Sequence, residues 1–339
     1  MAHGEPGQSR EPAKRRLPYL DNVKFFLIVC VVLGHAIKMG PTDTFDSARS
    51  LSVLIYSFHM PLFIFLSGLL LNRQKMTAQK IRTNVLLYVG YGYLAKLLRA
   101  SVPFLLEGTW KFSLLSEGGL PWYMFALAAF YALAWLLRKC DFALVGVLSV
   151  VLALVCGNFE QVGEFLCLSR IVVFFPFFWL GHALSPQRVI AFFARRSVRV
   201  ACVCMLAVAA VSCAALPGIL YPYRSLFLGR WCYALCDVPD CSWVNRLFAY
   251  AASLFTSVAV LGVVPQRRLP VASVCGSRTL WVYLLHHEVL DLLRHTELPA
   301  WLVSYEWNWL VLVPLAFVLA VVLALPIPAN PFAQLGKKR

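Results

Sequence analysis

Residues 309–325 read WLVLVPLAFVLAVVLAL, and residues 198–216 read VRVACVCMLAVAAVSCAAL. The first stretch has no charged side chain, and the second has a single arginine near its start. A helix needs about 20 mostly apolar residues to cross the hydrocarbon core of a bilayer, so stretches of this kind are typical of membrane-spanning helices. They predict a protein that folds inside a membrane.

The composition of the whole chain supports this prediction. Of its 339 residues, 60% are hydrophobic and only 14% are charged, with a formal net charge of +15. Soluble domains average about 45–50% apolar and about 25% charged residues, and disordered chains lack apolar residues, so both classes are excluded. An excess of Lys and Arg ordinarily suggests nucleic-acid binding. In a membrane protein it first indicates the cytoplasmic loops, and we predict no nucleic-acid partner.

A scan for apolar stretches of spanning length predicts an all-α, polytopic integral membrane protein with about ten transmembrane helices. The third and ninth segments are the weakest, because they carry Lys96 and Arg99, and His286, His287, Glu288 and Asp291, respectively. The segments lie near residues 20–39, 51–71, 84–104, 121–137, 142–159, 165–184, 198–216, 247–264, 277–293 and 308–325.

The basic residues gather on alternate loops when the N-terminus is placed inside, as the positive-inside rule expects. An even number of spans then puts both termini in the cytoplasm. We therefore predict a polar basic cytoplasmic tail (1–16), a transmembrane domain (17–326) and a basic cytoplasmic tail (327–339). The same topology serves a bacterial inner membrane or a eukaryotic endomembrane.

The outer loop over residues 217–246 is long and rich in aromatic residues, and we expect it to fold back against the membrane. It contains Cys232, Cys236 and Cys241, of which one pair forms a disulfide if that side is oxidising. No histidine accompanies these cysteines, so the spacing does not predict a zinc site.

Ionisable side chains inside a membrane helix are costly and usually mark a site. Lys24 and His35 are eleven residues apart, which places them on one face of the first helix, about 16 Å apart along its axis. Asp21 lies one turn before Lys24 and is expected to neutralise it. The structural alternative is that Lys24 extends its ammonium group to the membrane surface and that His35 is an interfacial histidine.

The second segment places His59 two residues before Pro61. A proline inside a helix frees a backbone carbonyl and permits a kink, which would open space near His59. The alternative is a buried histidine that is hydrogen-bonded to a neighbouring helix. Trp122 and Tyr123, near the start of the fourth segment, also fit the aromatic belt at a membrane surface.

Two further ionisable positions lie in later segments. Arg170 precedes an aromatic run, and extension of its side chain to the membrane surface explains it as well as anion binding does. His286 and His287 place two imidazoles in the ninth segment. Adjacent residues point to different faces of a helix, so we predict no metal site there.

Taken together, these stretches resemble the acyltransferase-3 family of integral-membrane O-acyltransferases. The hallmark of that family's first helix is a basic residue, ten intervening residues and a histidine, which Lys24 and His35 match. The similarity continues in order along the chain and is closest to the fucose 4-O-acetylase-like branch. It covers Phe58-His59-Met60-Pro61-Leu62-Phe63, Leu66-Ser67-Gly68, Trp122-Tyr123, Arg170 with Phe174-Phe175-Pro176-Phe177-Phe178, and Tyr283-Leu284-Leu285-His286.

The resemblance implies a ten-helix bundle that transfers acyl groups from cytoplasmic acyl-CoA, usually acetyl-CoA, to a hydroxyl of a sugar, glycan or lipid-linked sugar. The donor is a substrate, and no bound cofactor is implied. Two positions depart from the family pattern. Lys24 stands where much of the family has arginine, and an Arg-x-x-Arg element of some members is matched only imperfectly by Arg73-Gln74-Lys75.

O-acylation needs a base for the hydroxyl proton, and a neutral imidazole is suited to this near pH 7. We therefore expect His35 to be the base and Lys24 to hold a phosphate or the carbonyl of the donor. Arg73 and Lys75 would attract the CoA phosphates. We expect the remaining candidates to line the cavity for donor and acceptor, namely His59, Trp122, Tyr123, Arg170 and His286. A route through an acyl-histidine intermediate stays open.

The main alternative function is a multi-pass transporter of a sugar or acyl donor. Proton-coupled transporters commonly use a carboxylate embedded in the membrane. Here the carboxylates Asp21, Glu288 and Asp291 lie near the ends of predicted segments, and the sequence has no repeated segments broken by Gly or Pro. These features favour the acyltransferase.

Overall fold

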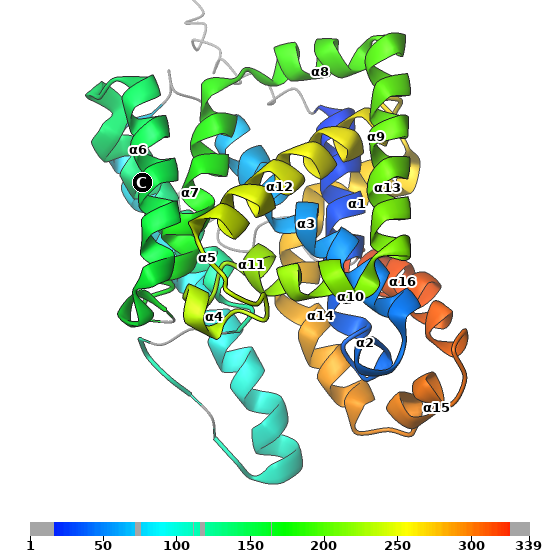
Figure 1. The fold of residues 1–339 in the computed structure, drawn as a ribbon. Coiled ribbons are helices and arrows are strands. Elements are labelled where there is room, and N and C mark those ends of the chain that lie inside the picture. The colour runs from blue at the N-terminus through cyan, green and yellow to red at the C-terminus, as the bar shows by residue number, and fades with distance from the viewer. Residues whose placement is uncertain (1–16, 72–75, 111, 116–118, 164, 326–339) are drawn as a thin grey trace, which may run out of the picture.

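The computed structural model describes residues 17–71, 76–110, 112–115, 119–163 and 165–325 (Figure 1). Within these ranges the chain forms helices joined by turns and short 3-10 segments, with no β-strand, as the sequence predicts. The helices are α1 (Pro18–Ala36), α2 (Pro41–Thr44), α3 (Asp46–Leu69), α4 (Ala78–Glu107), α5 (Trp122–Leu136), α6 (Phe142–Val155), α7 (Leu168–Ala183), α8 (Pro186–Ala194), α9 (Arg196–Ala215), α10 (Pro217–Leu220), α11 (Arg224–Leu228), α12 (Trp243–Val263), α13 (Pro270–Cys275), α14 (Thr279–Arg294), α15 (Leu298–Ser304) and α16 (Leu312–Ala324).

Each of the ten predicted segments coincides with one of these helices. Four of them, α1, α3, α9 and α12, are long and apolar enough to cross a membrane by themselves. A fifth span is added if α7 and α8, which meet at a bend of 84°, count as one. The number of spans and the cytoplasmic location of both termini stay predictions, and both predicted tails lie outside the described residues.

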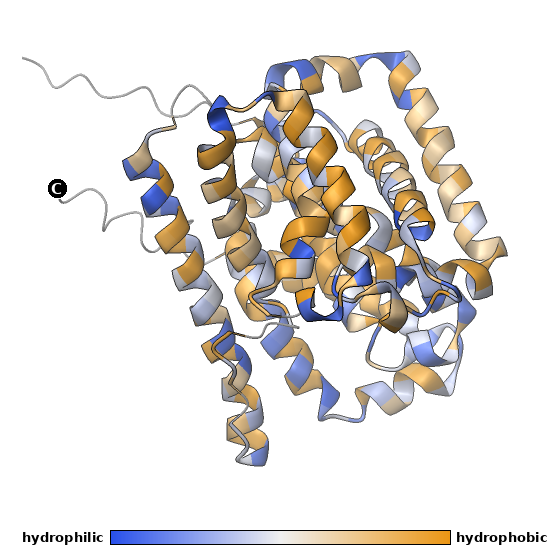
Figure 2. Cartoon of the chain, turned by 60° about the vertical axis from the view of Figure 1, so that its left-hand side comes forward, coloured by the Kyte–Doolittle hydropathy of each residue, from blue (hydrophilic) through white to orange (hydrophobic). Residues whose placement is uncertain are grey.

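The helices differ in how deeply they are buried in the bundle. In the most apolar window of α1 and of α3, 78% of the residues are buried inside the protein, against 11% for α9. Exposed valines run along the outer side of α9, namely Val200, Val203, Val208 and Val211. Figure 2 shows hydrophobic residues along the helices and hydrophilic ones gathered toward the ends of the bundle. The two helices that carry Lys24, His35 and His59 are therefore central, whereas α9 has the surface expected of a lipid-facing helix.

Helices α3 and α7 cross closely because each presents a glycine to the other. A methyl group on Gly68 would collide with the Phe178 carbonyl oxygen, and one on Gly181 would collide with the Phe65 carbonyl oxygen. Small residues at such crossings allow helix backbones to approach within a membrane. The crossing holds α3, with His59, against α7, with Arg170.

We expect Gly68→Ala to destabilise the protein by about 1–3 kcal/mol, the usual cost of adding a methyl group to a filled interface. Gly90→Ala in α4 is the matched control, because no atom lies within 4 Å of the added methyl group. At Gly90 the exchange to alanine should leave the stability of the protein unchanged or raise it, because alanine favours the helix. Thermal unfolding of both variants in detergent, followed by circular dichroism, measures the difference. Equal melting temperatures would contradict a tight crossing.

The aromatic loop over residues 217–246 folds back on the bundle, and its expected contact with the membrane stays a prediction. Its helices α10 and α11 pack against α3, where Leu226 and Phe227 are buried with Tyr56. Cys232, Cys236 and Cys241 are free thiols in this structure. The fold-back carries Arg224 toward the end of α1 that holds His35.

Candidate active site

Helix α1 places Lys24 near its start and His35 near its end. The ammonium group of Lys24 lies 2.6 Å from a carboxylate oxygen of Asp21, so the ion pair expected from their spacing is present. Pro18 in the first turn suits the beginning of the helix, because proline has no backbone N–H to leave unpaired there. Because α1 is long, Lys24 near its start and His35 near its end therefore lie in two separate regions of the bundle.

Lys24 lines a pocket of about 180 Å³ between α1, α3, α5 and α14, which we call the inner pocket. Its wall is mostly apolar, with a few hydroxyl groups from Ser67, Tyr123 and Thr279. The hydroxyl groups of Ser67 and Tyr123 are 3.1 Å apart and hydrogen-bonded. The pocket thus offers one cation and several hydroxyl groups to a bound molecule.

His35 lines a second and larger space of about 270 Å³, which we call the outer cavity. His59 from α3 and His287 from α14 line the same cavity. Six cationic side chains complete its polar wall, namely Lys38, Arg99, Arg170, Arg224, Arg230 and Arg294. The cavity therefore brings imidazoles together with a concentration of positive charge.

The two spaces adjoin inside the bundle. Val31, Met60 and Tyr283 line both, so the same three side chains separate the inner pocket from the outer cavity. Val31 lies between Lys24 and His35 on α1, and Met60 follows His59 on α3. The Tyr283 hydroxyl donates a hydrogen bond to the Leu120 carbonyl oxygen, which fixes this ring in the partition.

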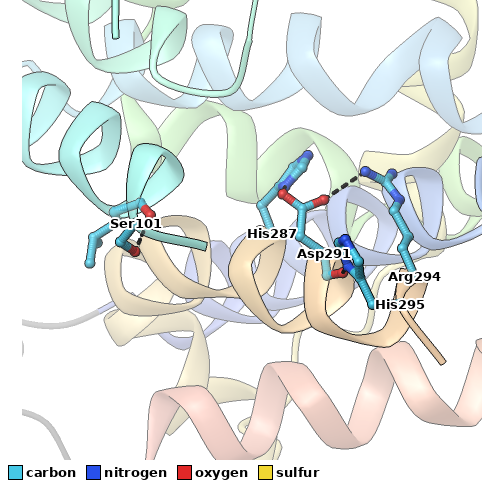
Figure 3. A network of polar contacts seen from close by, with 6 residues as sticks. Ser101, His287, Asp291, Arg294 and His295 are labelled. Carbon is cyan, nitrogen blue, oxygen red and sulfur yellow. Dashed lines mark hydrogen bonds and ion pairs between the residues drawn. The ribbon is translucent and has the colours of Figure 1, made fainter. Parts of the chain in front are cut away.

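Two histidines of α14 surround His35. The ring centres of His286 and His287 each lie 5.4 Å from that of His35. Nδ1 of His287 is 3.1 Å from Asp291 Oδ2, and the other oxygen of this carboxylate accepts a hydrogen bond of 2.7 Å from Arg294. Figure 3 shows the Asp291 carboxylate between the side chains of His287 and Arg294. A carboxylate bound in this way holds an imidazole in one tautomer and orientation.

The other two histidines are held by their own helices. Nδ1 of His286 lies 2.7 Å from the Val282 carbonyl oxygen, and Nδ1 of His59 lies 2.8 Å from that of Ile55. The ring of Tyr56 packs edge-on against His59 at 4.8 Å between ring centres. Among the described residues, no group of three or more His, Cys, Asp or Glu is arranged to hold a metal ion.

The structure distinguishes the alternatives for three predicted residues. Arg170 is only 5% exposed, so its side chain does not extend to the membrane surface. Its guanidinium lies 4.8 Å from the centre of the Trp122 ring, and both residues line the outer cavity. Trp122 is 8% exposed, and Tyr123 lines the inner pocket. Both aromatic residues therefore contribute to the interior walls of the bundle.

Not all predicted site residues lie together in the structure, and some residues of the site were not predicted. Arg73 and Lys75 lie outside the described residues. His286 lies beside His35 but is absent from the walls of both spaces, whereas its neighbour His287 lines the outer cavity. The contact between His287 and Asp291 could have been predicted from the sequence, because residues four apart on one helix lie next to each other. The sequence also did not single out Lys38 and Arg224, which line the outer cavity.

This fold and site define a class: a helical bundle with several helices long and apolar enough to span a membrane, and an interior lined by imidazole and cationic groups suited to group transfer. The chain belongs to the acyltransferase-3 family, because the model of its acyltransferase domain matches residues 17–327. The family resemblance is thereby confirmed, and it favours an acyltransferase over a transporter. The fucose 4-O-acetylase-like branch stays a prediction. No curated protein and no solved structure matches the chain.

Proposed function

We propose that this acyltransferase moves an acyl group, most simply acetyl, from acyl-CoA to a hydroxyl of a sugar or glycan. The observation that carries the proposal is the pair of adjoining spaces along α1, with Lys24 in one and His35 in the other. The donor occupies the inner pocket, and the acceptor occupies the outer cavity. Their reacting groups meet at the partition of Val31, Met60 and Tyr283.

The proposed step uses His35 as the general base. The imidazole takes the proton of the acceptor hydroxyl while the hydroxyl oxygen bonds to the thioester carbonyl carbon. The carbon–sulfur bond breaks, the thiolate of CoA leaves, and the proton held by His35 neutralises it. Lys24, paired with Asp21, binds the donor within the inner pocket. Arg73 and Lys75 are proposed to attract the CoA phosphates.

His287 is proposed to orient the acceptor. When its Nδ1 donates to Asp291, Nε2 keeps a lone pair that accepts a hydrogen bond in the outer cavity. His59 is held through Nδ1 in the same way and lines the same cavity. Arg170 and Trp122 support the wall beside them. His286 packs behind His35, which keeps the base in place.

Membranes that contain the protein, incubated with acetyl-CoA labelled in the acetyl group, test the function. The expected result is covalent label in a glycan or glycolipid fraction, stable to washing and released by mild alkali, as an ester should be. Label that enters sealed vesicles without a covalent product would instead support the transporter. Absence of any labelled product contradicts the proposed function.

Asp291→Asn is expected to lower acyl transfer about ten- to a hundredfold. The exchange replaces the carboxylate by an amide, which weakens the charge-assisted hydrogen bond to His287, worth about 1.5–3 kcal/mol, and no longer holds its tautomer; each 1.4 kcal/mol changes a rate tenfold. The KM for acetyl-CoA should stay unchanged, because Asp291 lies away from the inner pocket. Steady-state kinetics with the identified acceptor measures both constants. A rise confined to the KM of acetyl-CoA would contradict this role.

A further inference from the structure

The outer cavity carries more positive charge than general base catalysis requires. Six cationic side chains line it, and none of the described residues in its wall is a carboxylate. Two acidic groups of α14 interact with residues of the cavity wall: Asp291 bonds to His287 and Arg294, and Glu288 is close enough to Arg99 to interact with it. These two carboxylates lie on the α14 side of the cavity only.

Lys38 and Arg224 form the opposite side. The ammonium nitrogen of Lys38 and the guanidinium carbon of Arg224 each lie 4.9 Å from the centre of the same Tyr56 ring. Within the described part of the chain neither cation forms an ion pair, and Nε of Arg224 is buried without a hydrogen-bond partner. The Tyr56 ring and the Tyr221 hydroxyl, which accepts a hydrogen bond from Arg224, offset part of the repulsion between the two like charges, and an anion bound between them would remove it.

The titration of Lys38 agrees with this geometry. Lys38 stands in the turn after α1, beyond the end of the helix. Burial lowers its pKa, and the nearby Arg224 guanidinium adds to that decrease, although the Tyr56 hydroxyl opposes it. A bound anion between the two cations would favour the charged form of Lys38 again.

The phosphates of CoA do not explain this cluster. They lie at the opposite end of the phosphopantetheine arm from the thioester, so they cannot occupy the cavity of His35 while the thioester reacts there. Lys24 already supplies a cation in the inner pocket, where the donor is proposed to bind. At about 270 Å³, the outer cavity is also small beside usual small-molecule sites of about 300–1,000 Å³. It suits one sugar residue with its charged group.

Resting on the proposed function, we propose that the acceptor carries an anionic group, a carboxylate or a phosphate, on or next to the sugar that is acylated. Lys38 and Arg224 bind this group. The planar guanidinium can offer two parallel N–H donors to a carboxylate or phosphate, and the ammonium group adds a point charge. The contact places a hydroxyl of the same sugar near His35. A neutral sugar would leave both cations without a counter-charge.

The charge of the acylated product tests the proposal directly. Native membranes are incubated with labelled acetyl-CoA, and the labelled product is applied to an anion-exchange column at neutral pH. Retention is expected, and a labelled product that passes through uncharged overturns the inference. Methyl esterification abolishes retention if the anion is a carboxylate, and partition into chloroform–methanol identifies a phosphate on a lipid carrier. Both of these sources satisfy the proposal.

Variants locate the anion within the cavity. Lys38→Gln and Arg224→Gln should each raise the KM for the acceptor about ten- to a hundredfold, with the KM for acetyl-CoA unchanged. Arg224→Lys should recover part of the loss, because it keeps the charge. Arg188→Gln on α8 is the matched control, exposed and outside the cavity, and should behave as wild type. Melting temperatures exclude misfolding, and an unchanged acceptor KM in both cavity variants overturns the assignment.

A binding measurement keeps the inference separate from the proposed function. If no product is labelled, the proposed function fails, and the purified protein is titrated with inorganic phosphate. Trp122 and Trp231 line the cavity, so tryptophan fluorescence reports binding there. If wild type binds phosphate saturably and the Lys38→Gln, Arg224→Gln double variant binds it more weakly, the anion site is supported although the proposed function is not. No saturable binding to wild type overturns it.

Discussion

His35→Ala is expected to reduce acyl transfer by about two to four orders of magnitude while leaving the protein folded and inserted. General base catalysis contributes about 10²- to 10⁴-fold, and this variant removes the proposed base altogether. The side chain is half-buried beside the rings of His286 and His287 and makes no ion pair among the described residues, so its loss should cost little stability. Turnover of labelled acetyl-CoA into product, normalised to the amount of protein, is the measurement.

His295→Ala is the control for removal of a histidine from the same region. His295 follows α14, is exposed and lines neither the inner pocket nor the outer cavity. Its variant should retain wild-type turnover. If His35→Ala is equally active, His35 is not the base, and His287 becomes the next residue to replace.

Met60→Trp is expected to reduce transfer by about a hundredfold or more, although it replaces neither Lys24 nor His35. Met60 is half-buried and lines both the inner pocket and the outer cavity, so an indole ring at this position would extend into the region where the two substrates meet. Misplacing reacting groups by about 1 Å can cost about 10²-fold. Binding of acetyl-CoA to the purified variant should persist, because Lys24 and the other residues of the inner pocket are unchanged.

Met60→Leu is the matched exchange, because the two side chains have similar volumes and such swaps are well tolerated. It should keep most of the activity. Transfer at the wild-type rate in Met60→Trp would mean that the acyl group does not pass between these two spaces. Loss of acetyl-CoA binding in that variant would point to a wider disturbance of the inner pocket.

Hydrophobicity and length predicted the position of every major helix, but they did not predict which helices are central. Lys96 made the third segment a weak prediction because a charge in lipid is costly. In the folded protein Lys96 is buried and donates a hydrogen bond of 2.8 Å to the Ser113 carbonyl oxygen. A partner supplied by the following loop therefore accommodates this charge, and a scan of single helices does not include such partners.

The same limit applies to the site. The spacing of Lys24 and His35 along one helix was enough to place them on one face, and the structure keeps them there in adjoining spaces. His287 was not predicted as a site residue, and the divergence of neighbouring residues on a helix was only the reason to predict no metal site at His286 and His287. The ring of His287 nevertheless reaches the cavity beside His35, since α14 packs against α1. Arg224 reaches the cavity only through the fold-back of α10 and α11, which no local pattern specifies.

The partition of Val31, Met60 and Tyr283 also affects how much acyl-CoA is lost to hydrolysis. A thioester within reach of a histidine base is open to hydrolysis whenever water takes the place of the acceptor hydroxyl. Water that enters through the outer cavity reaches these three side chains before it reaches the inner pocket. Val31 is purely apolar, and Met60 is nearly so. Consumption of acyl-CoA should therefore depend on the acceptor, with little release of free acid in its absence.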